Sequence, residues 1–312
     1  MRFSIQSSEW KRLVVRYSSS AFLVCGLMSC ETLIQPDLER APQVLVVDAW
    51  VTIRHDAQEI SIKRTAGYFD NAGLPGVEDA SVVVRNVTTG RDFMFMHLAD
   101  GVYRWIPPTD ADSLGVVGDS FALSVVTSTG SYTAESRAGR VPVIDSVYFF
   151  REPASGLIPE STFAEFWAID PPGSGDTYWI KAWKNDTLLL RPSEINLAYD
   201  AGFSEGGNYD GGPFITPKRR GISPVVTDEE GNFLSPFRTG DSVYVEIHSI
   251  TRGAFEFMNQ VFIQTDRPGG FQELFASPPA NVSTNIKASG AAAAIGFFNV
   301  AHVSSNGRRL VN

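Results

Sequence analysis

The stretch ASVVVRNVTTGRDFMFMHLADGVYRW, residues 80–105, decides the fold. Residues 80–86 are rich in β-branched side chains, which favour extended strands. Thr88-Thr89-Gly90 and Asp100-Gly101 are turn sequences, so the chain reverses direction after each of them. The stretch therefore predicts three antiparallel strands joined by tight turns.

The same pattern continues on both sides of this stretch. Turn signals recur roughly every eight to twelve residues between residues 43 and 140, which is typical of an all-β sandwich. We expect residues 43–140 to form an Ig-like β-sandwich. Its other strands are predicted at 43–53, 59–64, 121–127 and 132–136.

Residues 141–312 carry more strand signals and one helix signal. Phe255, Met258 and Phe262 share one face at helical spacing, which predicts a helix at about 254–264. The fold class is therefore mainly β, with the sandwich followed by a second β-rich domain that carries this helix. The strands of this second domain are predicted at 163–169, 178–183, 241–247 and 293–303.

The N-terminal residues resemble an export signal. Four basic residues precede a short apolar stretch, residues 21–28, and then comes Ser29-Cys30. Leu27-Met28-Ser29-Cys30 resembles the lipobox of bacterial lipoproteins, in which the cysteine receives the lipid. We predict a signal peptide at 1–29, lipidation of Cys30 and an acylated tether at 30–42. The alternative is a buried apolar segment with incidental cysteines.

The lipid would be the protein's membrane anchor. The apolar stretch is too short for an ordinary membrane-spanning helix, and two or three acyl chains give stable attachment. Cys25 and Cys30 are the two cysteines of the chain, so the predicted mature protein has no internal disulfide. We expect no cofactor apart from the covalent lipid on Cys30.

The charge of the chain argues against nucleic acid as a partner. The formal net charge is −9. Residues 1–30 carry four basic residues and one acid, so the remainder has 22 basic and 34 acidic residues. A phosphate-binding surface requires the opposite balance.

The sequence offers little catalytic chemistry, so we expect a protein that is not an enzyme. The four histidines are isolated from one another and lack the spacing of a helical zinc site. Acids could still meet across a cleft, as glycoside hydrolysis requires. Asp228-Glu229-Glu230 has the composition of a hairpin tip, and the other candidates are Glu152, Glu160 and Glu165.

Three tryptophans and one loop are candidates for binding. Trp167, Trp179 and Trp183 invite a sugar-stacking interpretation, but strand alternation also places such side chains in a core. The loop at 199–213 offers oxygen ligands among glycines, which calcium favours. Its candidate ligands are Asp200, Glu205, Asn208 and Asp210, and an ordinary surface loop is the alternative.

The order of motifs along the mature part resembles the bacterial lipoprotein family known as domain of unknown function 4249 (DUF4249), found in Bacteroidota envelopes. The motifs are Val46–Trp50, Val77–Val82, Gly101–Tyr103, Gly118-Asp119, Pro142–Val147, Gly240-Asp241, Phe255–Gln264, Pro278–Val282, Asn285-Ile286, Gly290 and Ala294–Phe298. The first sandwich also resembles the prealbumin-like modules of Bacteroidota receptors, through the strand at 80–84 and Asp100–Tyr103.

The resemblance implies a family often encoded beside TonB-dependent outer-membrane transporters, with no assigned catalytic residues. We therefore expect a lipid-anchored outer-membrane protein that acts as a non-enzymatic accessory or ligand-binding partner of such a transporter. An envelope hydrolase acting on glycan or peptide, and a purely structural surface protein, are the alternatives. The sequence does not indicate which face of the outer membrane the protein occupies.

Overall fold

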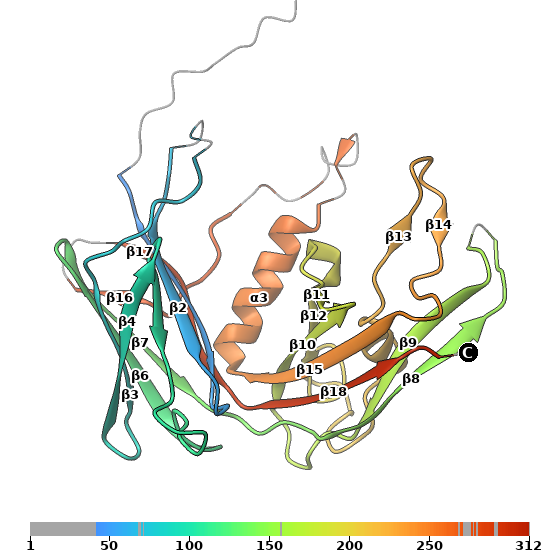
Figure 1. Ribbon diagram of the computed structural model, residues 1–312, viewed down its shortest axis with the longest axis horizontal. Coiled ribbons are helices and arrows are strands. Elements are labelled where there is room, and N and C mark those ends of the chain that lie inside the picture. The colour runs from blue at the N-terminus through green and yellow to red at the C-terminus, as the bar shows by residue number, and fades with distance from the viewer. Residues whose placement is uncertain are drawn as a thin grey trace, which may run out of the picture. The chain divides into compact units, whose positions relative to one another are not determined.

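The computed structural model describes residues 42–67, 70, 72–156, 158–267, 269–270, 276, 278, 280–289 and 293–311. Residues Pro42–Asn312 form one compact unit, drawn in Figure 1. The predicted signal peptide at 1–29 lies outside the described residues, as do Cys30 and nearly all of the tether at 30–42. None of the helices in the described ranges is long and apolar enough to cross a membrane.

The first sheet has nine strands in the order β16-β7-β6-β3-β4-β5-β2-β1-β17. The β1–β17 pair is parallel, and the other pairs are antiparallel. The strands are β1 (Leu45–Thr52), β2 (Gln58–Arg64), β3 (Ser81–Asn86), β4 (Arg91–Ala99), β5 (Val102–Trp105), β6 (Ser120–Thr127), β7 (Gly130–Arg137), β16 (Lys287–Ala288) and β17 (Ala294–Ala301).

This sheet rolls around its own core. β17 and β7 stand near opposite ends of the strand order, yet they contact each other, and Val300 N donates to Ser136 Oγ at 2.9 Å. The inward side chains of alternating residues, among them Val84, Phe93 and Phe95, form one buried cluster. The three strands predicted within residues 80–105 are confirmed as β3, β4 and β5.

The C-terminal part of the chain helps to build this first sheet. β16 and β17 follow the predicted boundary at residue 140, and Phe298 and Val300 belong to the first core. A parallel pair cannot be closed by a tight turn, so β17 reaches β1 only after a long excursion of the chain. Residues from both sides of the predicted boundary therefore form the first sheet.

A second sheet follows in the order β11-β10-β15-β18, with β12 also pairing with β10 (Figure 1). These strands are β10 (Thr177–Lys184), β11 (Thr187–Leu188), β12 (Asn196–Tyr199), β15 (Ser242–Ile250) and β18 (Val303–Arg309). Two hairpins accompany it: β8 (Ile144–Glu152) with β9 (Ser161–Ala168), and β13 (Val226–Thr227) with β14 (Phe233–Leu234).

The predicted helix is confirmed as α3 (Arg252–Thr265), while η1 (Pro192–Glu194) and α2 (Thr216–Arg220) are short. Thr251 is the N-cap of α3, and its hydroxyl accepts a hydrogen bond from Ala254 N. Ala254 and Met258 on α3 pack in a third buried cluster with Phe297 of β17. The fold is mainly β, as the sequence predicts.

Candidate functional site

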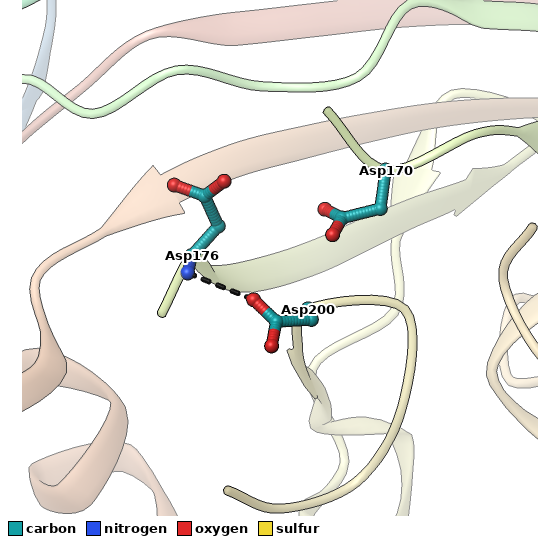
Figure 2. A group of neighbouring side chains, drawn as sticks. All are labelled: Asp170, Asp176 and Asp200. Carbon is teal, nitrogen blue, oxygen red and sulfur yellow. Dashed lines mark hydrogen bonds between the residues drawn. The ribbon is translucent and has the colours of Figure 1, made fainter. Parts of the chain in front are cut away.

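Three carboxylates meet beside the second sheet (Figure 2). One oxygen of each of Asp170, Asp176 and Asp200 lies within 4.8 Å of the others. Asp170 follows β9, Asp176 immediately precedes β10, and Asp200 immediately follows β12. The backbone N–H groups of Gly175 and Asp176 donate to Asp200 Oδ1 at 2.8 and 3.0 Å, which fixes this carboxylate against the start of β10.

The cluster carries more negative charge than its neighbours neutralise. Arg140 Nε donates to Asp176 Oδ2 at 2.7 Å. Among the described residues, no basic side chain forms an ion pair with Asp170 or Asp200. Asp170 is fully buried and accepts a hydrogen bond from the Tyr178 hydroxyl at 2.6 Å. Burial raises the pKa of Asp170 to about 6 despite that hydrogen bond.

The structure gathers a different set of acids from the one predicted for calcium. Of the four predicted ligands, Asp200 alone belongs to the cluster. Glu205 Oε2 pairs instead with Arg252 Nη2 at 2.6 Å, and Asp210 Oδ1 accepts from Gly173 N at 2.8 Å. Sequence reasoning missed Asp170 and Asp176. Asp170 directly follows the predicted strand at 163–169, and Asp176 shortly precedes the predicted strand at 178–183.

Carboxylate oxygens are the ligands that calcium prefers, so Asp170, Asp176 and Asp200 are the described residues best placed to hold such an ion. Hydrogen bonds within the protein already occupy part of the coordinating capacity of these groups. The calcium site stays a prediction.

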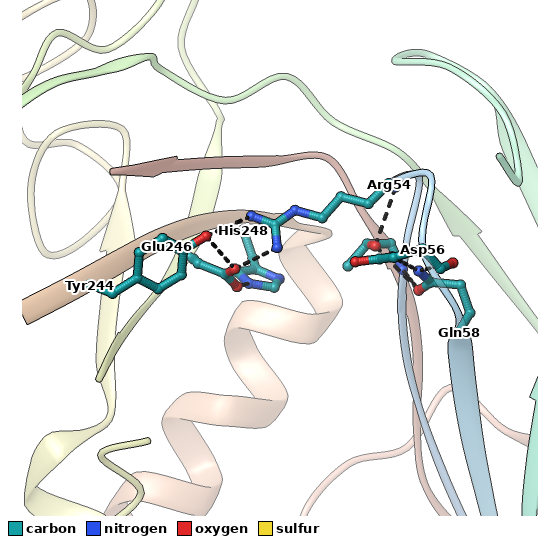
Figure 3. Close-up of polar contacts among 7 residues, drawn as sticks. Arg54, Asp56, Gln58, Tyr244, Glu246 and His248 are labelled. Carbon is teal, nitrogen blue, oxygen red and sulfur yellow. Dashed lines mark hydrogen bonds and ion pairs between the residues drawn. The ribbon is translucent and has the colours of Figure 1, made fainter. Parts of the chain in front are cut away.

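A second polar cluster joins the two sheets (Figure 3). Arg54, in the turn between β1 and β2, donates from Nη1 to Glu246 Oε1 on β15 at 2.5 Å. His248 Nε2 lies 2.6 Å from Glu246 Oε2, and the Tyr244 hydroxyl donates to Glu246 Oε1 at 3.2 Å. Tyr244, Glu246 and His248 share a face because alternate residues of a strand point the same way.

The charges of this cluster shift the titration of its members. Burial opposes ionisation of Glu246, but the hydrogen bond and charge of His248 and the charge of Arg54 lower its pKa to about 2. Burial lowers the pKa of His248 to about 4, so the imidazole is neutral at pH 7. Lys181 on β10 lies over the Trp179 ring at 4.0 Å, and burial lowers its pKa to about 8.

The three candidate tryptophans occupy different environments. Trp179 packs edge-on against Trp50 at 5.3 Å, in the cluster beneath α3. Trp183 contacts Tyr244 edge-on at 5.4 Å on the same face of the second sheet. Trp167 is the most exposed and lies on β9, where the Arg219 guanidinium covers its ring at 5.1 Å. Trp167 therefore does not share a surface with Trp179, and sugar binding stays a prediction.

The structure also places the other candidate acids, and Glu160 is exposed between β8 and β9. Asp228, Glu229 and Glu230 form the tip between β13 and β14, as predicted, and Asp228 Oδ1 accepts from Asn232 N at 2.7 Å. Glu152 and Glu165 come together, but Arg220 lies between them and donates to both.

Two hollows open on the described surface. The first, of about 440 Å³, lies between residues 117–118 and 137–140 on one side and residues 175–177 and 249–252 on the other. The second, of about 670 Å³, lies between residues 184–194 and residues 224–227. The carboxylate Asp176 lines the first hollow together with three arginines. Three leucines and two valines line the second, beside the charged side chains of Lys184, Arg191 and Glu194.

The comparisons with known proteins identify the family. The profile of the domain of unknown function DUF4249 matches residues 31–306. The chain belongs to the DUF4249 family. No curated protein matches it. The family match confirms the resemblance drawn from the order of the motifs, and it covers the first sheet, α3 and the second sheet up to residue 306 in β18.

Solved structures show only slight likeness to this DUF4249 chain. Bovine butyrophilin is 9% identical with a TM-score of 0.20, over 66% of this chain and 92% of that one. A putative carbohydrate binding protein from Bacteroides uniformis ATCC 8492 is 10% identical with a TM-score of 0.16, over 67% and 90% of the two chains. Neither likeness carries an argument about function.

Proposed function

We propose that this DUF4249 protein is a non-enzymatic, lipid-anchored accessory of a TonB-dependent outer-membrane transporter, which it holds through loops of its second β-rich region. The observation that supports this role is the larger hollow, where apolar side chains stand open to solvent. Leu190 is 62% exposed and Val225 is 54% exposed on its two walls. Large apolar side chains gathered in a hollow and left in water are typical of a binding surface.

The walls of the hollow are strand edges. On one side the chain continues from β11 through Leu189 and Leu190, and on the other Pro224 and Val225 lead into β13. β11 pairs with β10 and β13 pairs with β14, so each strand has one edge without a partner strand among the described residues. Such an edge offers backbone N–H and C=O groups to an extended segment of another protein.

Charged groups frame this apolar surface. Arg191 Nη1 donates to Val225 O at 3.1 Å and joins the two walls at one end. At the other end β13 leads into the acidic tip Asp228-Glu229-Glu230. An apolar centre with a charged rim is the usual anatomy of a protein interface. A segment with apolar side chains and a basic residue at one end complements this surface.

The lipid anchor is proposed from the predicted signal peptide at residues 1–29. The lipobox-like Leu27-Met28-Ser29-Cys30 stands directly before the part of the chain that the family profile covers. A diacylated or triacylated cysteine would hold the protein at the membrane surface beside an integral transporter. The outer membrane, rather than another membrane, is proposed from the family's habitat in Bacteroidota envelopes.

A pull-down from the native host tests the role. The protein is tagged at its C-terminus and solubilised gently from the outer membrane, and the proteins that co-purify are identified by mass spectrometry. We expect one TonB-dependent transporter in stoichiometric amount, and at least about tenfold less of it with a Leu190→Asp, Val225→Asp double variant, since burying two unpaired carboxylates is costly.

The control is Val143→Asp, which places a carboxylate at a valine that is more exposed than Leu190 or Val225 and lies outside either hollow. Recovery of the correctly lipidated protein alone, at normal abundance, would remove the stable-partner role. An undiminished yield with the double variant would show that the partner binds elsewhere.

A further inference from the structure

Two adjacent basic residues of the short helix α2 each lie against an aromatic ring. Lys218 Nζ is 4.3 Å from the centre of the Phe203 ring, and Arg219 Cζ is 5.1 Å from the centre of the Trp167 ring. Phe203 belongs to the loop after β12, and Trp167 belongs to β9. The face of an aromatic ring attracts a cation, so α2 joins rings from two separate segments of the chain.

Both rings, and a third beside them, are open to solvent. Trp167, Phe203 and Tyr209 are 37%, 54% and 41% exposed. A Cβ at Gly202, the residue before Phe203, would lie 2.4 Å from Tyr209 Cδ2, so the Tyr209 ring packs directly on the Gly202 backbone. We call these three rings the α2 platform. Large exposed apolar side chains that gather around one element are typical of a binding surface.

Lys218 is a buried cation without an ionic partner. The residue is 9% exposed, and its ammonium group forms no hydrogen bond or ion pair within the described part of the chain. Arg219 and Arg220, by contrast, both pair with Glu165, and Arg220 also pairs with Glu152. Burying a charge is costly unless the charge is paired. An anionic group of a ligand would supply the partner that Lys218 lacks.

The surroundings of Lys218 leave it available for such a partner. Burial lowers its pKa to about 8, and no neighbouring charge shifts it in either direction. The amine is therefore still mostly protonated at pH 7. No acid of the protein already neutralises it, so a carboxylate brought by a ligand would be its first counter-charge.

Rings beside an unpaired cation favour an acidic sugar as the ligand. The C–H bonds on one side of a sugar ring carry a slight positive charge, and this side packs on the negative face of an aromatic ring. A sugar carboxylate can then accept a charge-assisted hydrogen bond from the ammonium group of Lys218. The two contacts use the two kinds of group that the α2 platform offers.

Nucleic acid and a membrane surface fit these groups less well. Nucleic acid presents a phosphate at every nucleotide and requires several free cations, whereas Lys218 is the one basic residue of α2 without an acidic partner. Anionic lipids attract faces rich in Lys and Arg. The loop that carries Phe203 and Tyr209 instead exposes Glu205 and Asp210, which such a surface would repel.

We propose that the α2 platform binds an acidic saccharide, whose sugar rings pack on Trp167, Phe203 and Tyr209 and whose carboxylate pairs with Lys218. None of these residues lines either hollow, so the inference does not depend on the transporter partner. A site on an open surface binds a short saccharide weakly, and we expect a Kd on the order of 1 mM. Several copies on one membrane would hold a polymer of such sugars more tightly.

Calorimetric titration of the full chain, purified from its native host in a mild non-ionic detergent, tests the site. The probes are trigalacturonate, a hyaluronan tetrasaccharide and sialyllactose. Each is compared with its methyl ester, which keeps the sugar rings and removes the charge. We expect at least one acidic probe to bind, and its ester to bind at least about tenfold more weakly, because the ester cannot pair with Lys218.

Three variants assign the binding to the α2 platform. Lys218→Met should weaken the acidic probe at least about tenfold and leave the ester unchanged, whereas Phe203→Ala should weaken both. Lys287→Met removes an exposed lysine of β16 and is the matched control, which should bind as the native protein does. Circular dichroism checks that each variant is folded.

Three outcomes would overturn the proposal. One is the absence of binding by all three acidic probes at about 10 mM, well above the expected Kd. Another is an acidic probe that binds Lys218→Met as tightly as it binds the native protein. The third is a glutamate tetrapeptide that binds more tightly than every saccharide, which would assign the α2 platform to acidic peptides.

Discussion

Arg54 and Glu246 form an ion pair across 192 positions of sequence, between the β1–β2 turn of the first sheet and β15 of the second. Glu246 is buried and ionised, and His248, its other close partner, is neutral at pH 7. Arg54 is therefore the positive charge that directly contacts this buried carboxylate. The pair fixes the end of the first sheet against the second.

Removing the arginine should destabilise the protein measurably. We expect Arg54→Met to lower the free energy of unfolding by about 2 kcal/mol, because it leaves a buried carboxylate without its cation. Urea unfolding followed by tryptophan fluorescence measures this change. The control is Arg85→Met, which breaks the exposed Arg85–Asp92 pair and should cost less than about 0.5 kcal/mol. Equal effects of the two variants would contradict the structural role of Arg54.

The stability of the protein should depend on pH through the ionisation of Asp170. Its pKa is about 6 in the folded state, against 3.8 for an ordinary aspartate, so the folded state binds the proton more tightly. The contribution of Asp170 to the free energy of unfolding is fully present below about pH 4 and is lost as the pH rises through about 6. The loss is on the order of 3 kcal/mol.

Asp170→Asn should abolish that loss. The stability of the variant relative to the native protein should rise as the pH is raised from 4 to 7, because asparagine has no proton to lose. Chemical unfolding at each pH, in buffer with EDTA, measures the difference between the two proteins. Burial lowers the pKa of His248 in the folded state, so this residue makes the stability rise with pH. Its contribution is the same in both proteins and cancels in the difference between them. A difference in stability between the two proteins that stays constant from pH 4 to 7 would contradict the raised pKa of Asp170.

Gly296 should not tolerate a side chain. A Cβ at this residue would lie 1.9 Å from Val47 O, and its φ of +104° is one that other residues rarely adopt. We expect Gly296→Ala to cost more than about 2 kcal/mol, because β17 must move away from β1. Gly253→Ala in the first turn of α3 is the matched control. There the nearest atom is 3.6 Å away, and the change should be neutral or slightly stabilising. Thermal melting of the two variants distinguishes these outcomes.

Lipidation should depend on Cys30 and not on Cys25. We expect Cys30→Ala to lose its acyl mass and to leave the membrane fraction, because the acyl chains provide the proposed attachment. Mass spectrometry of the N-terminal peptide and fractionation of cells measure both effects. Cys25→Ala, which changes a cysteine inside the predicted signal, is the control and should remain lipidated. Membrane retention of Cys30→Ala would show that another feature anchors the protein.

Local sequence was sufficient for the strands within residues 80–105 and for α3, but it did not predict β8, β12 or β18. Residues 80–105 specify their three strands because β-branched residues and turn residues act over a few positions. The helix at about 254–264 is recognisable because Phe255, Met258 and Phe262 repeat at the helical period. The acidic tip at residues 228–230 was predictable for the same reason, since its turn composition is local.

Pairings between distant segments were not predictable from these patterns. Nothing in residues 294–301 specifies that β17 lies parallel to β1, because any apolar strand could occupy that edge. Likewise, Asp170 and Asp176 were overlooked while Asp200 was grouped with Glu205 and Asp210. Asp200, Glu205 and Asp210 were grouped because they are close together in the sequence. In the structure, Asp200 instead meets the carboxylates that lie after β9 and just before β10.

The sequence by itself determined the family, the mainly β class, the long helix α3 and the charge balance, because each is carried by composition or by short-range pattern. Only the tertiary structure decided that Arg54 meets Glu246, that three aspartates converge, and that Met94, Met96 and Leu98 on β4 stay open to solvent. These depend on which strand edges pair and on which face each sheet buries. Both are set by the free energy of packing the whole chain, and no local segment contains that information.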